Sequence, residues 1–228
     1  MITAVGRLYD AIGWDAEAQA ARPSALLSAG TWEEIIAASS ASLQRSHPPL
    51  ADASALVSRW SGQLEGLHAC DSPVIADLPG FLRRCRDVYG LTVAVCTSDS
   101  RHSTEQALHN WDVTSLVDHV VCGDDGHAAK PSVEPLLELC ERARVRPADC
   151  IVVGDTLSDT QMARSAGTGL AVGVLTGSGT PEQLTRGGAH LIVPSIGDLP
   201  RLFDAMRLTR VDDMPLSAPA QQQSAARL

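Results

Sequence analysis

The stretch that decides the fold is Ile151-Val-Val-Gly-Asp-Thr-Leu-Ser-Asp-Thr-Gln-Met-Ala-Arg-Ser-Ala-Gly167. A short apolar run ends in a glycine, two aspartates four residues apart follow, and a helix-forming segment stops at a second glycine. This pattern predicts a buried strand whose carboxyl end delivers Asp155 and Asp159 into the crevice where open α/β sheets bind ligands. Two close carboxylates repel each other unless a cation lies between them, and oxygen ligands suit Mg²⁺. The alternative interpretation is a solvated loop with an acidic helix cap.

The segments around this stretch alternate between helical and strand patterns. Residues 180–183 read Thr-Pro-Glu-Gln, a capping box with proline at the first helical position, which predicts a helix start. Alternation of this kind predicts an α/β fold with a doubly wound parallel sheet. Helices are expected at 79–90, 103–110, 132–144, 160–166 and 199–207, and strands at 91–96, 119–122, 150–154, 169–175 and 191–193.

Three regions follow from the change in pattern along the chain. Residues 1–72 are expected to be entirely helical, with a capping box at Thr31-Trp-Glu-Glu34 and a third helix that Asp52 can cap. Residues 73–210 are expected to form the α/β core. Residues 211–228 are rich in proline and glutamine and are expected to be disordered.

Composition excludes several classes of protein. The net charge of −9 and the lack of a basic run argue against a nucleic-acid or anionic-membrane surface. No apolar stretch approaches the roughly 18 residues of a membrane span, and no secretory signal is evident. The six cysteines form no C-x-x-C pair, so we expect free thiols in a reducing compartment and a cytoplasmic protein.

Polar groups follow three of the predicted strands. Thr97 and Ser98 end the first and offer hydroxyls and backbone N–H groups to phosphate oxygens, although such clusters also occur as plain helix caps. Lys130, followed by a proline, lies in a loop after the second strand, where a lysine is most often only solvated. Asp155 and Asp159 follow the third. The carboxyl ends of parallel strands meet at one edge of a sheet, so we expect these groups to converge.

At these positions the sequence resembles the haloacid dehalogenase-like (HAD) hydrolases. Thr97, Lys130-Pro131 and Gly154-Asp-Thr-Leu-Ser-Asp159 are similar to the second, third and fourth motifs of that family, and Gly173-Val-Leu-Thr-Gly177 also fits. The resemblance covers residues from about 74 to 207. It places the helical first third where the family has its helical cap.

The resemblance implies phosphoryl transfer through an aspartyl-phosphate with Mg²⁺. Asp155 would bind the metal and Asp159 would support it or hold its waters. Thr97, with Ser98 beside it, would bind the phosphoryl group, and Lys130 would neutralise its charge. The capped, phosphoglycolate phosphatase-like branch implies a small phosphorylated metabolite as substrate. The oligomeric state cannot be read from the sequence.

The first motif of the family is absent from the sequence. It is an apolar strand ending in Asp-x-Asp, whose first aspartate is the nucleophile, and these 228 residues contain no Asp-x-Asp. In the family this strand lies between the strands that end at Thr97 and at Asp155, so its absence would leave two buried sheet edges unpaired. We expect the chain to begin inside the first cap helix, downstream of the motif.

Three interpretations of that absence compete. In the first, which we favour, the sequence is an N-terminally incomplete phosphatase. In the second, it is a short form that binds its ligand without catalysis. In the third, a partner supplies the missing strand.

A signalling receiver domain is an alternative from another class, because it also places acids, a hydroxyl and a lysine on a doubly wound sheet. Its acids, however, precede the hydroxyl and the lysine, which is the reverse of the order here. Asp99, Arg101 and His102 lie near Thr97 and are either substrate contacts or surface caps.

Overall fold

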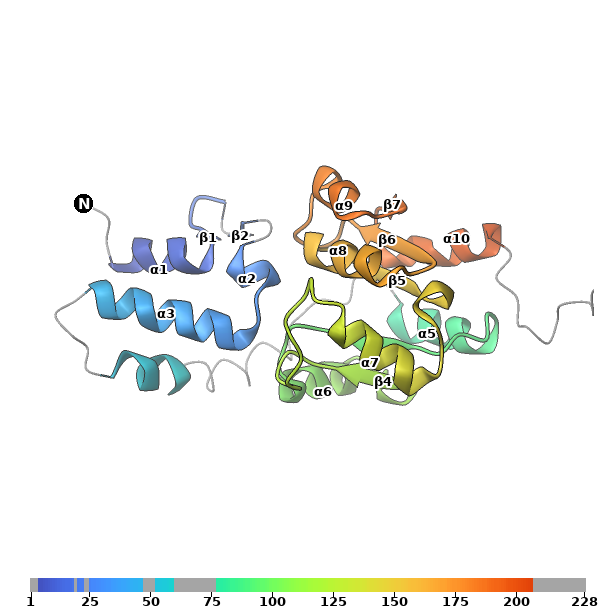
Figure 1. Ribbon diagram of the computed structural model, residues 1–228, viewed down its shortest axis with the longest axis horizontal. Coiled ribbons are helices and arrows are strands. Elements are labelled where there is room, and N and C mark those ends of the chain that lie inside the picture. The colour runs from blue at the N-terminus through green and yellow to red at the C-terminus, as the bar shows by residue number, and fades with distance from the viewer. Residues whose placement is uncertain (1–3, 19, 23–24, 47–51, 60–76, 207–228) are drawn as a thin grey trace, which may run out of the picture.

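The computed structural model describes residues 4–18, 20–22, 25–46, 52–59 and 77–206. The predicted boundary at residues 72/73 and the predicted disordered tail at 211–228 lie outside these ranges. Within them, no helix is both long and apolar enough to cross a membrane. The N-terminal helices lie beside the α/β core (Figure 1).

The N-terminal region is mainly helical, with α1 (Ala4–Ile12), α2 (Leu26–Ala29), α3 (Trp32–Ser46) and a helical stretch at 53–59. The predicted capping box forms, because Thr31 Oγ1 accepts from the Glu34 N–H and the Thr31 N–H donates to the Glu34 carboxylate. The prediction of an entirely helical region was wrong. After α1 the chain turns at Gly13 (φ +80°) and makes a short antiparallel pair of β1 (Trp14–Asp15) and β2 (Ala20–Ala21). A left-handed glycine redirects the backbone in a way that helical periodicity alone does not reveal.

The core alternates helices and strands, as predicted. Helix starts follow local chemistry, since Asp77 caps α5 and Ser100 caps α6 through their side chains. The predicted Thr180 capping box is confirmed. The elements are α5 (Leu78–Asp87), β3 (Ala94–Cys96), α6 (Arg101–Asn110), β4 (His119–Val121), α7 (Glu134–Ala143), β5 (Ile151–Gly154), α8 (Leu157–Ala166), β6 (Leu170–Val174), α9 (Pro181–Gly187), β7 (Leu191–Val193) and α10 (Leu199–Ala205).

Some predicted boundaries were wrong. The strand predicted at 91–96 is paired only over Ala94–Cys96, and α8 starts at Leu157, three residues before the predicted start. Val133 occupies the N-cap position of α7 and makes no side-chain cap. Ser132, the predicted cap, lies one residue before this position, and its hydroxyl does accept from the Glu134 N–H at 3.3 Å.

All strand pairs of the core are parallel, but its strands form two separate sheets. β3 pairs with β4, with Val95 opposite Val120, and β5, β6 and β7 follow one another in the second sheet. Among the described residues no backbone pairing joins β3 to β5. The doubly wound parallel architecture is therefore present, and the break lies where the sequence predicts a missing strand.

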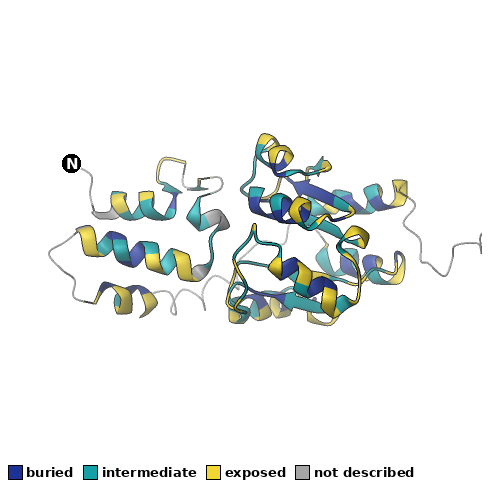
Figure 2. Cartoon of the chain, viewed as in Figure 1, coloured by how far each residue is buried: buried dark blue, intermediate teal, exposed yellow. Residues whose placement is uncertain are grey.

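Helices cover both faces of the strands, so the core has three layers. On one face Cys85 of α5, Tyr89 just after that helix and Phe203 of α10 pack against Val172 of β6. On the other, α7 and α8 pack Leu136, Cys140 and Met162 against β3 and β5 side chains. β6 is the most deeply buried of the described strands and is shown in dark blue in Figure 2.

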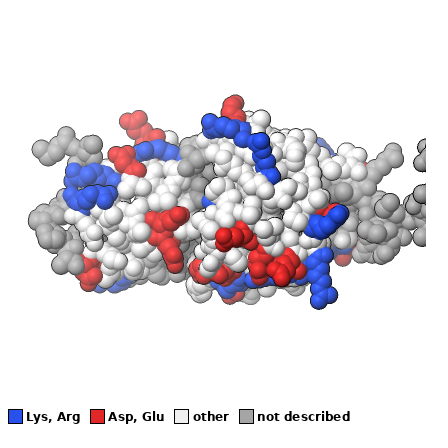
Figure 3. All heavy atoms as spheres, viewed as in Figure 1, with Lys and Arg blue, Asp and Glu red and all other residues white. Residues whose placement is uncertain are grey.

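The cysteines of the described ranges are free thiols, as predicted; Cys70 lies outside these ranges. The Sγ atoms of Cys140 and Cys150 lie 3.6 Å apart. On the face shown in Figure 3, basic side chains lie scattered among acidic and uncharged ones.

Candidate active site

Asp155 directly follows β5, and a neighbouring loop fixes its position. The Ser178 N–H donates to Asp155 Oδ2 at 3.2 Å, and the Gly179 N–H donates to the Asp155 carbonyl at 2.9 Å. A Cβ at Gly177 would overlap the Asp155 carboxylate. The loop after β6 therefore needs a glycine here in order to approach and orient the acid.

The Asp159 carboxylate is buried and satisfied within the protein. It accepts from the Thr156 N–H at 3.0 Å and from Thr156 Oγ1 at 2.7 Å, while the Asp159 N–H donates to Thr156 Oγ1. This reciprocal pair is a capping box at the start of α8. Gly154 permits it, since a Cβ there would overlap the Asp159 side chain.

Lys130 lies in the loop between β4 and α7, before the cis peptide bond to Pro131. Its Nζ lies 2.8 Å from Asp159 Oδ1 and 3.5 Å from the Cys96 carbonyl. The side chains of Lys130 and Asp159 are each only 12% exposed. Burial by itself lowers the pKa of Lys130, but the charge of Asp159 and the hydrogen bond to it outweigh burial, so the pKa lies above its ordinary value. Lys130 thus stays charged and connects the end of β3 to α8 across the break between the sheets.

Thr97 follows β3, and its hydroxyl is engaged within its own turn. Thr97 Oγ1 donates to the Asp99 carboxylate at 2.9 Å and accepts from the Asp99 N–H at 3.1 Å. Ser98 is half-buried beside it, and its carbonyl packs so close to Gly123 that a Cβ on the glycine would overlap it. The Thr97–Asp99 turn is therefore held by internal bonds and by contact with the loop after β4.

The other two residues considered near Thr97 differ in surroundings. Arg101 donates to both oxygens of Asp125 and is committed to a structural ion pair. His102 is exposed at the start of α6.

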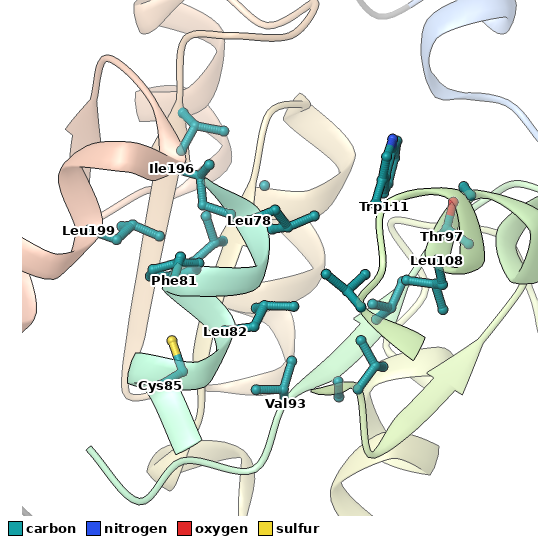
Figure 4. A pocket seen from close by; sticks show the side chains of 18 of the residues that line it. Leu78, Phe81, Leu82, Cys85, Val93, Thr97, Leu108, Trp111, Ile196 and Leu199 are labelled. Carbon is teal, nitrogen blue, oxygen red and sulfur yellow. The ribbon is translucent and has the colours of Figure 1, made fainter. Parts of the chain in front are cut away.

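An apolar cavity of about 690 Å³ lies between the two sheets. Side chains of α5, β3 and the start of α10 project into it (Figure 4). Thr97 and Asp155 border the cavity from opposite sheets, whereas Lys130 and Asp159 lie outside its lining. The structure thus gathers the predicted residues at the carboxyl ends of β3 and β5, divided by this cavity.

Sequence reasoning missed the supporting residues. Ser178, Gly177 and Thr156 set the orientation of the two predicted acids, yet none was assigned a role. Thr156-x-x-Asp159 has capping-box spacing, which was a readable signal for Thr156. The contact between residues 177–179 and Asp155 joins loops more than 20 positions apart and carries no local signal.

The described residues offer a limited set of metal ligands. No group of three or more His, Cys, Asp or Glu side chains forms a metal cluster among them. Both Asp159 oxygens are engaged, whereas the Asp155 carboxylate accepts one hydrogen bond within the described residues, from the backbone N–H of Ser178. Mg²⁺ is usually bound through one or two carboxylates with waters and substrate phosphate oxygens. Asp155 fits such a site as one metal ligand. Asp159, whose carboxylate is bonded to Lys130, fits a supporting position beside it.

Known proteins of similar sequence support the resemblance. A phosphoglycolate phosphatase of Nitrosospira multiformis is 38% identical over 79 residues, 35% of either chain. The phosphoglycolate phosphatase of Escherichia coli K12 is 29% identical over 144 residues, 63% of this chain and 55% of the relative. The matches thus span about one third to just over half of these relatives' lengths.

Solved structures share the fold. The crystal structure of a predicted phosphoglycolate phosphatase from Haemophilus somnus 129pt superposes with a TM-score of 0.67 at 19% identity, covering 75% of this chain and 77% of that one. A putative β-phosphoglucomutase from Thermotoga maritima gives a TM-score of 0.60 at 20% identity, covering 72% and 74%. The family model described as haloacid dehalogenase-like hydrolase matches residues 4–167, which is most of the chain. The chain therefore belongs to the haloacid dehalogenase-like hydrolase family and resembles its phosphoglycolate phosphatase-like members.

Proposed function

We propose that this chain carries part of a Mg²⁺-dependent phosphatase site for a small phosphorylated metabolite similar to phosphoglycolate. The observation that carries the proposal is the buried Lys130–Asp159 pair, 2.8 Å apart, at the sheet edge where Thr97 and Asp155 also lie. A charged lysine beside hydroxyl and carboxylate groups suits a phosphoryl group, whose transfer spreads negative charge over its oxygens. Free thiols in the described part of the chain support a cytoplasmic location.

Each residue has a role that follows from its surroundings. Lys130 is held by Asp159 and places a positive charge beside the end of β3. Thr97 Oγ1 now donates to the Asp99 carboxylate and would donate to a phosphate oxygen in its place when phosphate binds. Ser98 offers further donors beside it. Asp155 would hold Mg²⁺, which neutralises phosphate charge when bound.

Hydrolysis through an aspartyl-phosphate also needs a nucleophilic carboxylate. The sequence contains no Asp-x-Asp, and none of the described residues presents such a pair beside Asp155. This favours a second candidate function, a catalytically inactive HAD-like protein that binds a phosphorylated metabolite. It is also compatible with the incomplete phosphatase favoured above, whose nucleophile would lie in a segment that these 228 residues do not include.

Phosphate binding tests the part shared by both candidates. Calorimetric titration of inorganic phosphate into the 228-residue protein, with and without Mg²⁺, should show binding that Mg²⁺ strengthens. Asp155→Asn should weaken binding in Mg²⁺ by about tenfold or more, equivalent to about 1.4 kcal/mol. Asp149→Asn is the matched control, since that aspartate pairs with Arg146 on the surface. Equal binding by wild type and Asp155→Asn would remove the basis of the proposal.

Hydrolysis tests what both candidates share, the lack of a nucleophile in these 228 residues. We expect no Mg²⁺-dependent hydrolysis of p-nitrophenyl phosphate by these 228 residues; turnover abolished by Asp155→Asn would reveal a relocated nucleophile. The genomic sequence upstream of Met1 separates the two candidates. An in-frame apolar strand ending in Asp-x-Asp would support the incomplete phosphatase, and a stop codon there would leave the binding protein.

A further inference from the structure

Two free thiols meet where α7 leads into β5. Cys140 lies in the last turn of α7, and Cys150 directly precedes β5. Their Sγ atoms lie 3.6 Å apart, so the two sulfur atoms are in contact. Cys140 is only 5% exposed, whereas Cys150 is half-buried. The pair is therefore accessible from the side of Cys150.

The surroundings of the pair do not suit a metal ion. In the described part of the chain no three His, Cys, Asp or Glu side chains gather into a metal site, so the two thiols would have to hold an ion alone. The carboxylate next to them in the chain, Asp149, is paired with the Arg146 guanidinium at 2.8 Å. Structural Zn²⁺ sites have four protein ligands. Two thiols in contact without further ligands are instead the reactants of a disulfide.

The connection between the thiols allows them to approach. A disulfide places its sulfur atoms about 2.05 Å apart, so the two atoms must move together by about 1.5 Å. The Cys150 S–H donates to the Arg146 carbonyl at 3.4 Å, and a thiol is a weak donor. Residues 144–146 are all exposed. The approach therefore shifts a surface turn and gives up one weak hydrogen bond.

A bond between these thiols would join parts of the core that no strand pairing joins. Cys140 packs in one cluster with Cys96 of β3, and Arg142 of α7 donates to the Val120 carbonyl of β4 at 3.0 Å. α7 thus packs on the first sheet, beside β4 in Figure 1. Cys150 leads into β5 of the second sheet. The bond would therefore fasten the helix on one sheet to the facing strand of the other.

We infer that Cys140 and Cys150 form a redox modification site, at which a small disulfide such as oxidised glutathione produces a reversible internal disulfide. The Cys150 thiolate attacks one sulfur of oxidised glutathione, and one glutathione thiolate leaves. The Cys140 thiolate then attacks Cys150 Sγ, and the second glutathione thiolate leaves. The two protein thiols lose two electrons, oxidised glutathione gains them, and the two thiol protons end on the two reduced glutathione molecules. The inference is independent of phosphate binding and catalysis.

The rate and the equilibrium of this exchange have different causes. Burial raises the pKa of the Cys150 thiol, and its contact with Cys140 adds to the rise. Little thiolate is therefore present at neutral pH, and exchange is slow. The equilibrium depends instead on how close the fold holds the two thiols, because the second exchange is intramolecular. The equilibrium is the quantity to measure.

Equilibration with glutathione tests the inference on the full 228-residue protein. The protein is kept without oxygen in mixtures of reduced and oxidised glutathione until its oxidised fraction is constant, and the remaining thiols are then trapped with N-ethylmaleimide. Arg142 and Arg144 lie between the two cysteines, so trypsin separates the Cys140 and Cys150 peptides unless a disulfide links them. Mass spectrometry of the linked peptide gives the oxidised fraction.

The same equilibrium in concentrated urea is the reference. The ratio of the native to the unfolded equilibrium constant equals the stability that the bond adds to the fold, by linkage. We expect a ratio of about tenfold or more, equivalent to about 1.4 kcal/mol. Cys140→Ala should abolish the linked peptide. Cys85→Ala is the matched control, because Cys85 is also 5% exposed but packs on the other face of the sheets, and this variant should still form the link.

The outcomes are distinct. A linked Cys140–Cys150 peptide that is more favoured in the native protein than in urea supports the inference. A ratio of one or less would mean that the fold does not hold the thiols for a bond. Glutathione that stays on Cys150 without forming the link, or a link from either cysteine to another cysteine or a second chain, would mean that the pair does not react as a unit. Each of these results overturns the inference.

Discussion

The Lys130–Asp159 pair should show a large energetic coupling, because it is buried. At 2.8 Å and an effective dielectric constant of about 20, the gross attraction is about 6 kcal/mol, and desolvation of both charges offsets much of it. We therefore expect a coupling of about 2 kcal/mol in a double-mutant cycle. Lys130→Met alone should cost about 3 kcal/mol, because it leaves a buried carboxylate without its cation.

The assay is urea unfolding followed by circular dichroism at neutral pH without divalent cations. The cycle comprises wild type, Lys130→Met, Asp159→Asn and the double variant. A matched cycle at Arg146 and Asp149 has the same 2.8 Å separation, but those side chains are 80% and 50% exposed. Its coupling should vanish within error. If both cycles give the same coupling, burial does not strengthen the central pair and the reasoning fails.

Three further predictions test other parts of the structure. Gly177→Ala should weaken Mg²⁺-dependent phosphate binding in calorimetry about tenfold, because the added Cβ overlaps the carboxylate that follows β5; unchanged affinity would contradict this. The hydrogen bond from Arg101 lowers the pKa of Asp125 below its usual 3.8, so this carboxylate stabilises the fold above that pH. The stability lost in Asp125→Asn should therefore disappear on acidification through the lowered pKa, as measured by thermal melts. Val172→Ala should cost about 2 kcal/mol in urea unfolding, and Val153→Ala, its register partner beside the cavity between the sheets, less than half of that; equal losses would mean that Val153 is packed as closely as Val172.

The fold was predictable because its signals are local. Periodic apolar residues, capping boxes such as Thr180–Gln183 and glycines such as Gly167 lie within single elements, and the structure confirms those elements. Predicted strand boundaries were wrong where hydrogen bonding to a neighbouring strand sets the length of the element. β3 is shorter than its apolar run because only Ala94–Cys96 find register partners on β4.

The candidate site was predictable in position but only partly in detail. Parallel topology brings Thr97 and Asp155 to one edge, as the order of the strands implies. The role of Asp159 stayed ambiguous in the sequence, because the same Asp that suits a metal also completes a capping box with Thr156. The support of Asp155 by Ser178 depends on a contact between distant loops, which no local pattern encodes.

The geometry also makes the proposed phosphate and Mg²⁺ positions parts of one site. Thr97 belongs to one sheet and Asp155 to the other, with Lys130 bonded to both sides of the break. A phosphate held by Thr97 and Lys130 would therefore share its surroundings with a Mg²⁺ ion held by Asp155. Such binding is reciprocal, so Mg²⁺ that tightens phosphate binding must itself bind more tightly in the presence of phosphate, by the same factor. A factor above one, measured by calorimetry in either order of addition, distinguishes a coupled site from two independent ones.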